Sequence, residues 1–307
     1  MTLASNEKKQ IAIITAVALA VFVGMRFLPT GTNLNHMDFR VSGQNSIEFC
    51  DPSNPQFIPV VAVRSPVAMA LKWDGVPTAG RESRGTVVLS TSNGKPIEPQ
   101  DLVVAHTRKL HLLIVDPTLR DYQHVHPEPG RVRGEWMFAF TPKERGTYRV
   151  FADFTPAATG RGLYASADVE VANQALSIVD TSHRGGKPFP LETERDGFRF
   201  TLGSTNSPIR AGQPADLQFS ASRLDGGVVD MQPVMGAFAH LVALDEARSG
   251  FAHLHPGETD LDKKPDATKP TLNFKITIPQ PGKYVIWAQV NLGGREVFVP
   301  FWFEVAQ

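Results

Sequence analysis

The chain has 307 residues, of which 42% are hydrophobic and 20% are charged, a composition typical of a globular protein long enough for two domains. The formal net charge is zero and no long basic run occurs, so nothing in the sequence indicates a nucleic-acid-binding surface. With 24 prolines and 25 glycines, turns are frequent, and an all-β fold is favoured beyond the N-terminus.

An apolar segment near the N-terminus predicts a membrane helix. Residues 11–25 (IAIITAVALAVFVGM) carry no charge and follow Lys8 and Lys9. Extended to 11–28, the segment reaches about 18 residues, near the lower limit for crossing a bilayer. The two lysines predict a cytoplasmic N-terminus over 1–10. No A-x-A-like cleavage site follows, so an uncleaved signal anchor is favoured over a cleaved signal peptide.

The remainder is therefore expected outside the cytoplasm, as the periplasmic bulk of a single-pass inner-membrane protein. Residues 29–60 show little periodicity and predict a linker. Two units of similar size follow, 61–172 and 196–307, joined by a connection over 173–195. Short strand signals punctuated by glycine and proline predict about seven strands in each unit. The expected fold is two tandem immunoglobulin-like or cupredoxin-like β-sandwiches.

The two units match along their length. In each, a Gly-x-Tyr sequence opens a late strand, at Tyr148 in the first unit and Tyr284 in the second. Such a tyrosine is typical of β-sandwiches, where its hydroxyl bonds to backbone a few residues away. We expect both tyrosines to have this structural role.

A histidine pattern also occurs twice with identical spacing. It comprises a histidine, an aspartate five residues later and an H-x-H-P sequence that starts eight residues after the aspartate. Its two copies are His111, Asp116, His124 and His126, and His240, Asp245, His253 and His255. Histidine is the commonest side-chain ligand of transition metals, so the pattern predicts metal binding.

Each copy is expected to form a β-hairpin, because turn residues separate two strand-like segments. If the first loop is 117–120, Asp116 opposes Asp121 and His111 opposes His126. His111, His124 and His126 then share one face of the sheet. A register shifted by one residue places His111 on the other face, and the sequence does not decide between the two.

Further candidate ligands precede each copy by five residues, His106 in the first and Met235 in the second. Imidazole combined with thioether suits copper, which is the metal we expect. The candidate ligands are therefore His240, His253, His255, Met235, His111, His124, His126 and His106. The two aspartates either accept hydrogen bonds from these rings or shape the turns. No His…Cys…Met arrangement of a blue-copper site is present.

Three residues lie outside the pattern. Cys50 is the only cysteine, so no intramolecular disulfide forms, and we expect a buried thiol, with an intermolecular bridge or a metal ligand as alternatives. His36 and His183 are expected to be exposed to solvent.

The sequence resembles a known group of domains. The segments 233–242 (PVMGAFAHLV) and 251–256 (FAHLHP) resemble bacterial extracytoplasmic β-sandwich domains of the YtkA-like and FixH-like kind, and related heavy-metal-binding domains with a GAxxHxV…HxHP signature. The segments 109–116 (KLHLLIVD) and 124–127 (HVHP) resemble the same motif without its Gly-Ala. The resemblance covers both units and implies a copper- or heavy-metal-related role at the membrane surface, often as an accessory to a larger system.

Two functional hypotheses follow. In the first, a membrane-anchored periplasmic protein binds copper for delivery, storage or resistance. In the second, a non-catalytic structural or accessory subunit docks on a membrane or envelope complex, and its histidines are structural. Both include a protein partner and attachment to the membrane. An enzyme is not expected, because no GxSxG, Walker or HExxH motif occurs.

Overall fold

The computed structural model describes residues 4–26, 32–40, 55–172 and 189–307. It divides into two compact units, Met1–Asn33 and Leu34–Gln307. Cys50 and His183 lie outside the described residues, as does most of each predicted connecting segment. His36 is exposed, as predicted.

The first unit contains helix α1, Ser5–Arg26. Its Ser5–Met25 segment is long and apolar enough to cross a membrane, and none of the residues in that apolar window is buried. The helix begins before the apolar run because Glu7, Lys8 and Lys9 are good helix formers. It fits a membrane anchor or a signal sequence.

The second unit contains two repeats. The first repeat comprises β1 Val67–Trp73, β2 Ser83–Thr91, β3 Leu110–Val115, β4 Tyr122–Val125, β5 Glu128–Pro129, β6 Glu135–Phe140, β7 Gly146–Phe154 and β8 Leu163–Val171, with short 3-10 helices at His36–Phe39 and Pro99–Asp101. These strands form two antiparallel sheets in the orders β1-β2-β6-β5 and β4-β3-β7-β8. Val87 and Trp136 of one sheet share a hydrophobic core with Leu112 and Val150 of the other. The first repeat is therefore a β-sandwich.

The second repeat has the same plan. Its strands are β9 Leu191–Arg195, β10 Phe198–Ser204, β11 Pro214–Arg223, β12 Met231–Gln232, β13 Ala239–Asp245, β14 Phe251–Leu254, β15 Thr271–Thr277, β16 Gly282–Leu292 and β17 Arg295–Val305. One sheet has the order β15-β11-β10-β9, and the other has the order β12-β16-β13-β14 with β17 on β16. The prediction of an all-β chain with two tandem sandwiches after one helix is confirmed.

One predicted boundary differs from the structure. Strand β9 lies in the segment 173–195 that the sequence predicted as a connection, and it pairs with β10 along its length. Its sequence, LETER, contains one apolar residue, Leu191, which is buried in the core of the second repeat. One apolar residue among four polar ones gives no periodic signal, so this edge strand was missed.

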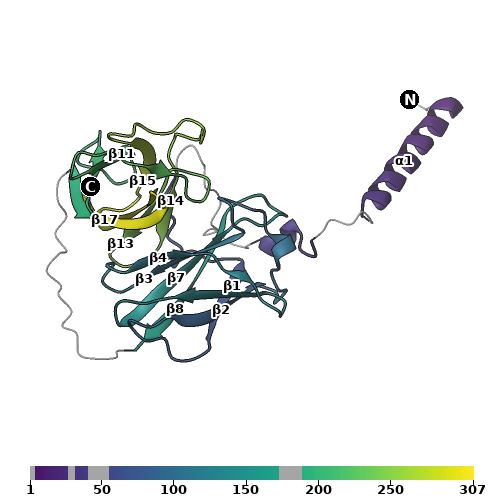
Figure 1. Cartoon of the computed structure of the whole chain (residues 1–307). Helices are drawn as coiled ribbons and strands as arrows, with labels where there is room; N and C mark the ends of the chain where they lie inside the picture. Colours follow the sequence, from purple (N-terminus) through teal and green to yellow (C-terminus); the bar gives the residue numbers. More distant parts are fainter. Residues whose placement is uncertain (1–3, 27–31, 41–54, 173–188) are drawn as a thin grey trace. The chain divides into compact units, whose positions relative to one another are not determined.

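The first strand of each histidine hairpin, β3 or β13, is buried on both faces. In β3, Leu112 and Ile114 pack into the first repeat, whereas Leu113 and Val115 face the second repeat. All six residues of β3 are buried. The sheets that carry the histidines therefore pack against each other, and β3, β4 and β13 lie close together in Figure 1.

This packing creates a third core, which we call the interface core. Its buried members are Ile58, Val60, Leu113, Val115, Leu119, Tyr122, Phe151, Tyr164, Val242, Leu244, Phe251, Val285 and Trp287. Tyr122 stacks on Trp287 with ring centroids 5.7 Å apart, and Phe151 packs on Phe251 at 5.3 Å. The two repeats thus form one body.

The end of the predicted linker also belongs to this interface. Ile58 exchanges two backbone hydrogen bonds with Phe251, at 2.8 and 3.1 Å. The neighbouring Gly250 has no room for a side chain, because a Cβ there would collide with the carbonyl of Ile58. Residues near 58 are therefore part of the folded body, contrary to a linker extending to residue 60.

Candidate metal centre

The register of the first hairpin is the one that places its histidines together. Leu113 pairs with His124 and Val115 pairs with Tyr122, while the amide of Asp116 donates to the carbonyl of Asp121. This pairing puts His111 opposite His126, so the prediction based on a 117–120 loop is confirmed. The second hairpin has the same register, since Val242 pairs with His253.

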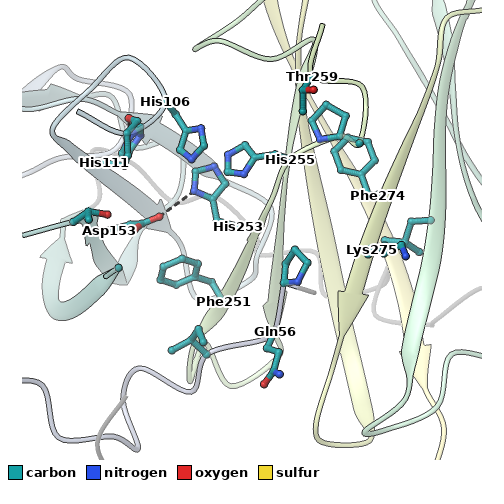
Figure 2. Close-up of a pocket in the computed structure, with 18 of the residues that line it drawn as sticks. Gln56, His106, His111, Asp153, Phe251, His253, His255, Thr259, Phe274 and Lys275 are labelled. Carbon is teal, nitrogen blue, oxygen red and sulfur yellow. Dashed lines mark hydrogen bonds and ion pairs between the residues drawn. The ribbon is translucent and has the colours of Figure 1, made fainter. Parts of the chain in front are cut away.

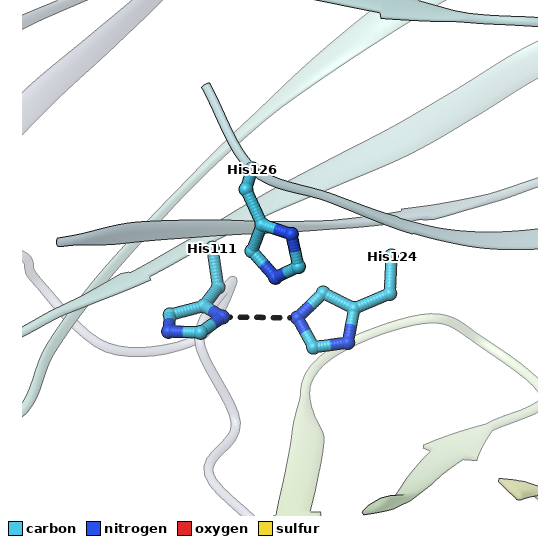
Figure 3. Close-up of side chains that lie close together, drawn as sticks. All are labelled: His111, His124 and His126. Carbon is cyan, nitrogen blue, oxygen red and sulfur yellow. Dashed lines mark hydrogen bonds between the residues drawn. The ribbon is translucent and has the colours of Figure 1, made fainter. Parts of the chain in front are cut away.

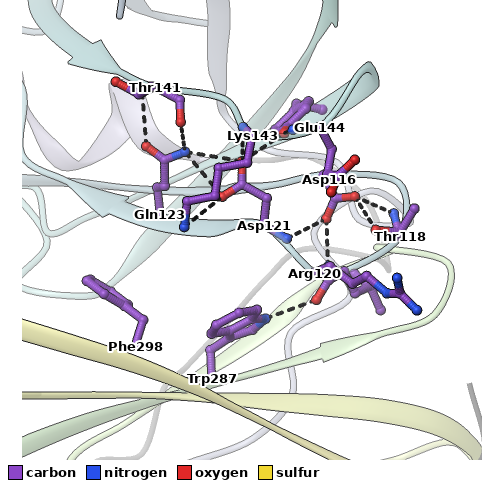
Figure 4. A network of polar contacts seen from close by, with 12 residues as sticks. Asp116, Thr118, Arg120, Asp121, Gln123, Thr141, Lys143, Glu144, Trp287 and Phe298 are labelled. Carbon is purple, nitrogen blue, oxygen red and sulfur yellow. Dashed lines mark hydrogen bonds and ion pairs between the residues drawn. The ribbon is translucent and has the colours of Figure 1, made fainter. Parts of the chain in front are cut away.

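The two aspartates of the pattern shape the turns. The Asp116 carboxylate accepts backbone hydrogen bonds from Thr118, Arg120 and Asp121 at 2.8, 2.7 and 2.9 Å (Figure 4). In the second hairpin, Asp245 accepts from the amide of Ser249 at 2.7 Å. Of the two roles that the sequence left open, the structure shows the turn-forming one.

The two corner tyrosines hold neighbouring turns. Tyr148 donates to the Asp121 carboxylate at 2.8 Å and accepts from the amide of Glu144 at 2.9 Å. Tyr284 donates to the carbonyl of Gln280 at 3.0 Å. The predicted bond from the hydroxyl to nearby backbone is present in both repeats. In the first repeat, the second bond of the Tyr148 hydroxyl, to Asp121, also fixes the start of the strand that carries His124.

His111, His124 and His126, which we call triad one, bring their rings together (Figure 3). One nitrogen from each ring lies within 4.8 Å of the other two. Nδ1 of His111 is 3.1 Å from Nε2 of His124. Nε2 of His126 is buried and has no hydrogen-bond partner among the described residues. Ligand nitrogens about 2.0 Å from a tetrahedral metal lie about 3.3 Å from each other, close to the 3.1 Å between the nitrogens of His111 and His124.

The outward hydrogen bonds of triad one determine where its protons lie. Nε2 of His111 faces the carbonyl of Ala105 at 3.0 Å, and Nδ1 of His124 faces Oε1 of Gln289 at 2.9 Å. Both partners are acceptors, so both of these nitrogens carry the proton. The facing nitrogens, Nδ1 of His111 and Nε2 of His124, then hold lone pairs that point at each other. A cation between them resolves this repulsion.

His240, His253 and His255, which we call triad two, repeat the arrangement. Their ligand nitrogens also lie within 4.8 Å of one another. Nδ1 of His240 is 3.3 Å from Nε2 of His253, and Nε2 of His255 is buried without a partner among the described residues. Nε2 of His240 donates to the carbonyl of Val234 at 2.9 Å. Nδ1 of His253 donates to Oδ2 of Asp153 at 3.0 Å.

Burial keeps these rings neutral, because it disfavours the charged imidazolium. Burial lowers the pKa of His126 to about 3 and that of His240 to about 4. The pKa values of His111, His124, His253 and His255 are also lowered, first by burial, although Asp153 opposes the shift at His111. Neutral imidazole is the form that binds metals, so the rings are in a ligand-competent state at neutral pH.

In each triad, one histidine ring forms a hydrogen bond with a side chain of the other repeat. His124 of the first repeat bonds to Gln289 on β16, and His253 of the second repeat bonds to Asp153 on β7. The two partners occupy equivalent places, because Asp153 pairs with His111 and Gln289 pairs with His240. Neither residue was predicted from the sequence. Their signal is a single polar residue in an apolar strand, in FADF and WAQV.

The two triads form one histidine cluster. The ring centroids of His124 and His253 are 5.3 Å apart, and those of His111 and His253 are 5.9 Å apart. Seven of the eight candidate ligands from the sequence therefore lie together in the interface between the repeats, the six triad rings and His106, whose ring is 5.9 Å from those of His240 and His253. The cluster combines two groups that can each hold a metal ion.

The two candidates outside the triads, His106 and Met235, occupy equivalent tight turns, with φ of 49° and 50°. His106 of the first repeat stacks on His255 of triad two, with centroids 3.7 Å apart and ring planes at 15° (Figure 2). The ring of His106 therefore lies flat against the ring of His255. His106 belongs to neither triad. A ligand role for His106 and Met235 stays a prediction.

A pocket of ≈ 1070 Å³ reaches triad two (Figure 2). His106, Asp153, His253 and His255 line one part of it. The aromatic rings of Phe154, Tyr164, Phe251 and Phe274 and the cations Arg161 and Lys275 line other parts. The pocket therefore gives access from solvent to one side of the histidine cluster.

The fold and the cluster define a duplicated β-sandwich protein with two histidine triads that can hold metal ions. A family model of domains of unknown function, DUF8832, matches residues 65–173 and again residues 193–307, and the chain belongs to this family. The two matches support a duplicated domain. A comparison with curated proteins finds no match.

Proposed function

We propose that this protein binds copper at the two triads and holds it for delivery, storage or resistance at the periplasmic face of the inner membrane, to which α1 anchors it. The observation that carries the proposal is the set of outward hydrogen bonds in each triad. Two rings of each triad bond through one nitrogen to an outer acceptor, and one nitrogen from each of the three rings lies within 4.8 Å of the other two.

The alternative function, a structural lock made by the histidines, fits this arrangement less well. A lock would place an N–H of one ring toward the lone pair of the next. Here Ala105 and Gln289 accept hydrogen bonds from the N–H groups of His111 and His124. A neutral ring has one N–H group, so none is left for the 3.1 Å contact between those two rings. Buried polar groups are normally satisfied, so two lone pairs that face each other support the binding of a cation rather than a lock.

The donor set supports copper. Imidazole suits copper, zinc and nickel, and copper(II) is the most strongly bound divalent ion of the first row. Outer hydrogen bonds to a carbonyl, an amide and a carboxylate fix the rings, as is usual at metal-binding histidines. We propose a non-catalytic role, with a partner protein that supplies or receives the metal, because the pocket gives a route for exchange at triad two.

Metal analysis tests the proposal. Full-length protein in detergent would be loaded with Cu(I), Cu(II) or Zn(II), desalted and assayed by mass spectrometry for metals. We expect two equivalents of copper in the wild type and one when either triad is changed to alanine, with His36→Ala as a control outside both triads. No retained metal, together with loss of stability in the triad variants, would support the structural alternative.

A further inference from the structure

We propose that the two triads are unequal, and that Asp153 makes triad two the tighter and more divalent-selective site, which fills first. This inference rests on the proposed function, because it concerns the metals that the triads hold. Its basis is the different chemistry of two residues in equivalent places, a carboxylate at Asp153 and an amide at Gln289.

At triad two, the carboxylate acts directly on a ligand ring. Oδ2 of Asp153 accepts the Nδ1 proton of His253 at 3.0 Å, and the two side chains are 18% and 6% exposed. A carboxylate bonded to the far nitrogen of a ligand histidine makes the ring a stronger donor. Its negative charge also offsets part of the charge of the bound ion, and a bound cation in turn favours the ionised carboxyl group.

At triad one, the equivalent partner is neutral. Oε1 of Gln289 accepts from His124 at 2.9 Å, and its Nε2 donates to Glu296 at 2.8 Å. These two bonds fix the orientation of the buried amide. A neutral acceptor orients the ring but does not compensate the charge of a cation.

Asp153 also lies beside triad one, because it pairs with His111 across the sheet, but its hydrogen bond is to triad two. A divalent ion carries twice the charge of Cu(I), so these differences favour divalent ions at triad two more strongly.

Access follows the same asymmetry. His253 and His255 of triad two line the ≈ 1070 Å³ pocket, and from triad one only His111 does. The pocket therefore reaches two rings of triad two and one ring of triad one.

The test is a competition titration of full-length protein with Zn(II) and with Cu(I), using a chromophoric chelator of known affinity. We expect two steps with Zn(II) in the wild type. The tighter step is lost in His255→Ala, and the weaker step is lost in His126→Ala. With Cu(I), the gap between the steps is smaller.

Three variants then isolate the cause. Asp153→Asn keeps an acceptor for His253 but removes the charge, and it should weaken the tight Zn(II) step by roughly tenfold to a hundredfold. Gln289→Glu combined with Glu296→Gln places a carboxylate at triad one without a facing carboxylate, and it should strengthen the weak step. Asp168→Asn is the control, because Asp168 pairs with Arg149 and not with a histidine.

The outcomes are distinguishable. Two equal Zn(II) steps in the wild type, or a tight step that is unchanged in Asp153→Asn, would overturn the inequality and leave the proposed function standing. No metal bound by the wild type would overturn both. Misfolding does not explain a gain of affinity in the Gln289→Glu, Glu296→Gln variant, so that variant keeps the test decisive if Asp153→Asn is unstable.

Discussion

The indole Nε1 of Trp287 donates to the carbonyl of Leu119 at 3.2 Å. This bond joins the second repeat to the turn of the hairpin that carries triad one (Figure 4). Leu119 has a positive φ of 61°, a conformation that is costly for a branched side chain and that the interface core holds in place. The position of the first histidine hairpin therefore depends on packing between the repeats.

Replacing Trp287 should accordingly destabilise the folded body. Trp287→Ala removes a buried aromatic ring from the interface core, and we expect the free energy of unfolding to fall by about 3–5 kcal/mol. Trp287→Phe keeps most of the packing but leaves the carbonyl of Leu119 without its donor, which should cost about 1–3 kcal/mol. Urea denaturation measures both, with the half-buried Trp302→Phe as the control. Equal urea midpoints for the Trp287→Ala, Trp287→Phe and Trp302→Phe variants would contradict the role of the indole bond.

Close packing at Gly250 gives a second prediction. A Cβ at this position meets the carbonyl of Ile58, so Gly250→Ala should separate the 55–60 segment from β14 and lower stability by about 1–3 kcal/mol. The matched control is Gly75→Ala, since nothing lies within 4 Å of a Cβ there. Hydrogen exchange at the amides of Ile58 and Phe251 should quicken only in the first variant. Protection that stays unchanged at these amides would rule out the contact.

Metal should stabilise the body as a whole, because both triads lie between the repeats. A ligand present at 100 times its Kd adds about 2.7 kcal/mol per site to the free energy of unfolding. We therefore expect copper to raise the melting temperature and a chelator to reverse the increase. Changing triad one to alanine should leave part of the increase, and changing both triads should abolish it. An equal increase in the protein lacking both triads would place the metal elsewhere.

The metal-free protein should lose stability in mild acid. The folded pKa values of His240 and His126 are about 4 and about 3, below the ordinary value of 6.5. Between these limits the unfolded chain binds more protons than the folded one, so stability is fully present above pH 6.5 and decreases as the pH falls toward 4. Urea midpoints of metal-free protein at pH 7.5 and pH 5 measure the slope. Changing both triads to alanine should flatten it, and an equal slope in that variant would assign the acid sensitivity to other groups.

Much of the candidate site followed from the sequence. The residues DPTLRD predicted a turn, and a loop over 117–120 was one of two registers that the sequence left open. The structure has this register, which brings His111, His124 and His126 to one face. The strand-like segment before this turn is strand β3. These inferences succeeded because they depend on local chain geometry.

The rest depends on contacts between distant segments. Asp153 and Gln289 touch their histidines across the interface between repeats, and no local pattern states which strand faces which. The stacking of His106 on His255 crosses the same interface. The packing of the two sandwiches, rather than either hairpin alone, assembles the cluster.

The contacts between the repeats are reciprocal. Tyr122 meets Trp287 just as its counterpart Phe251 meets Phe151, and each repeat supplies the outer partner of one ligand in the other. Such reciprocal contacts are those of an isologous interface between two identical subunits. Two identical subunits would carry the same residue at both positions. A single polypeptide has no such constraint, and here one half carries an aspartate where the other carries a glutamine.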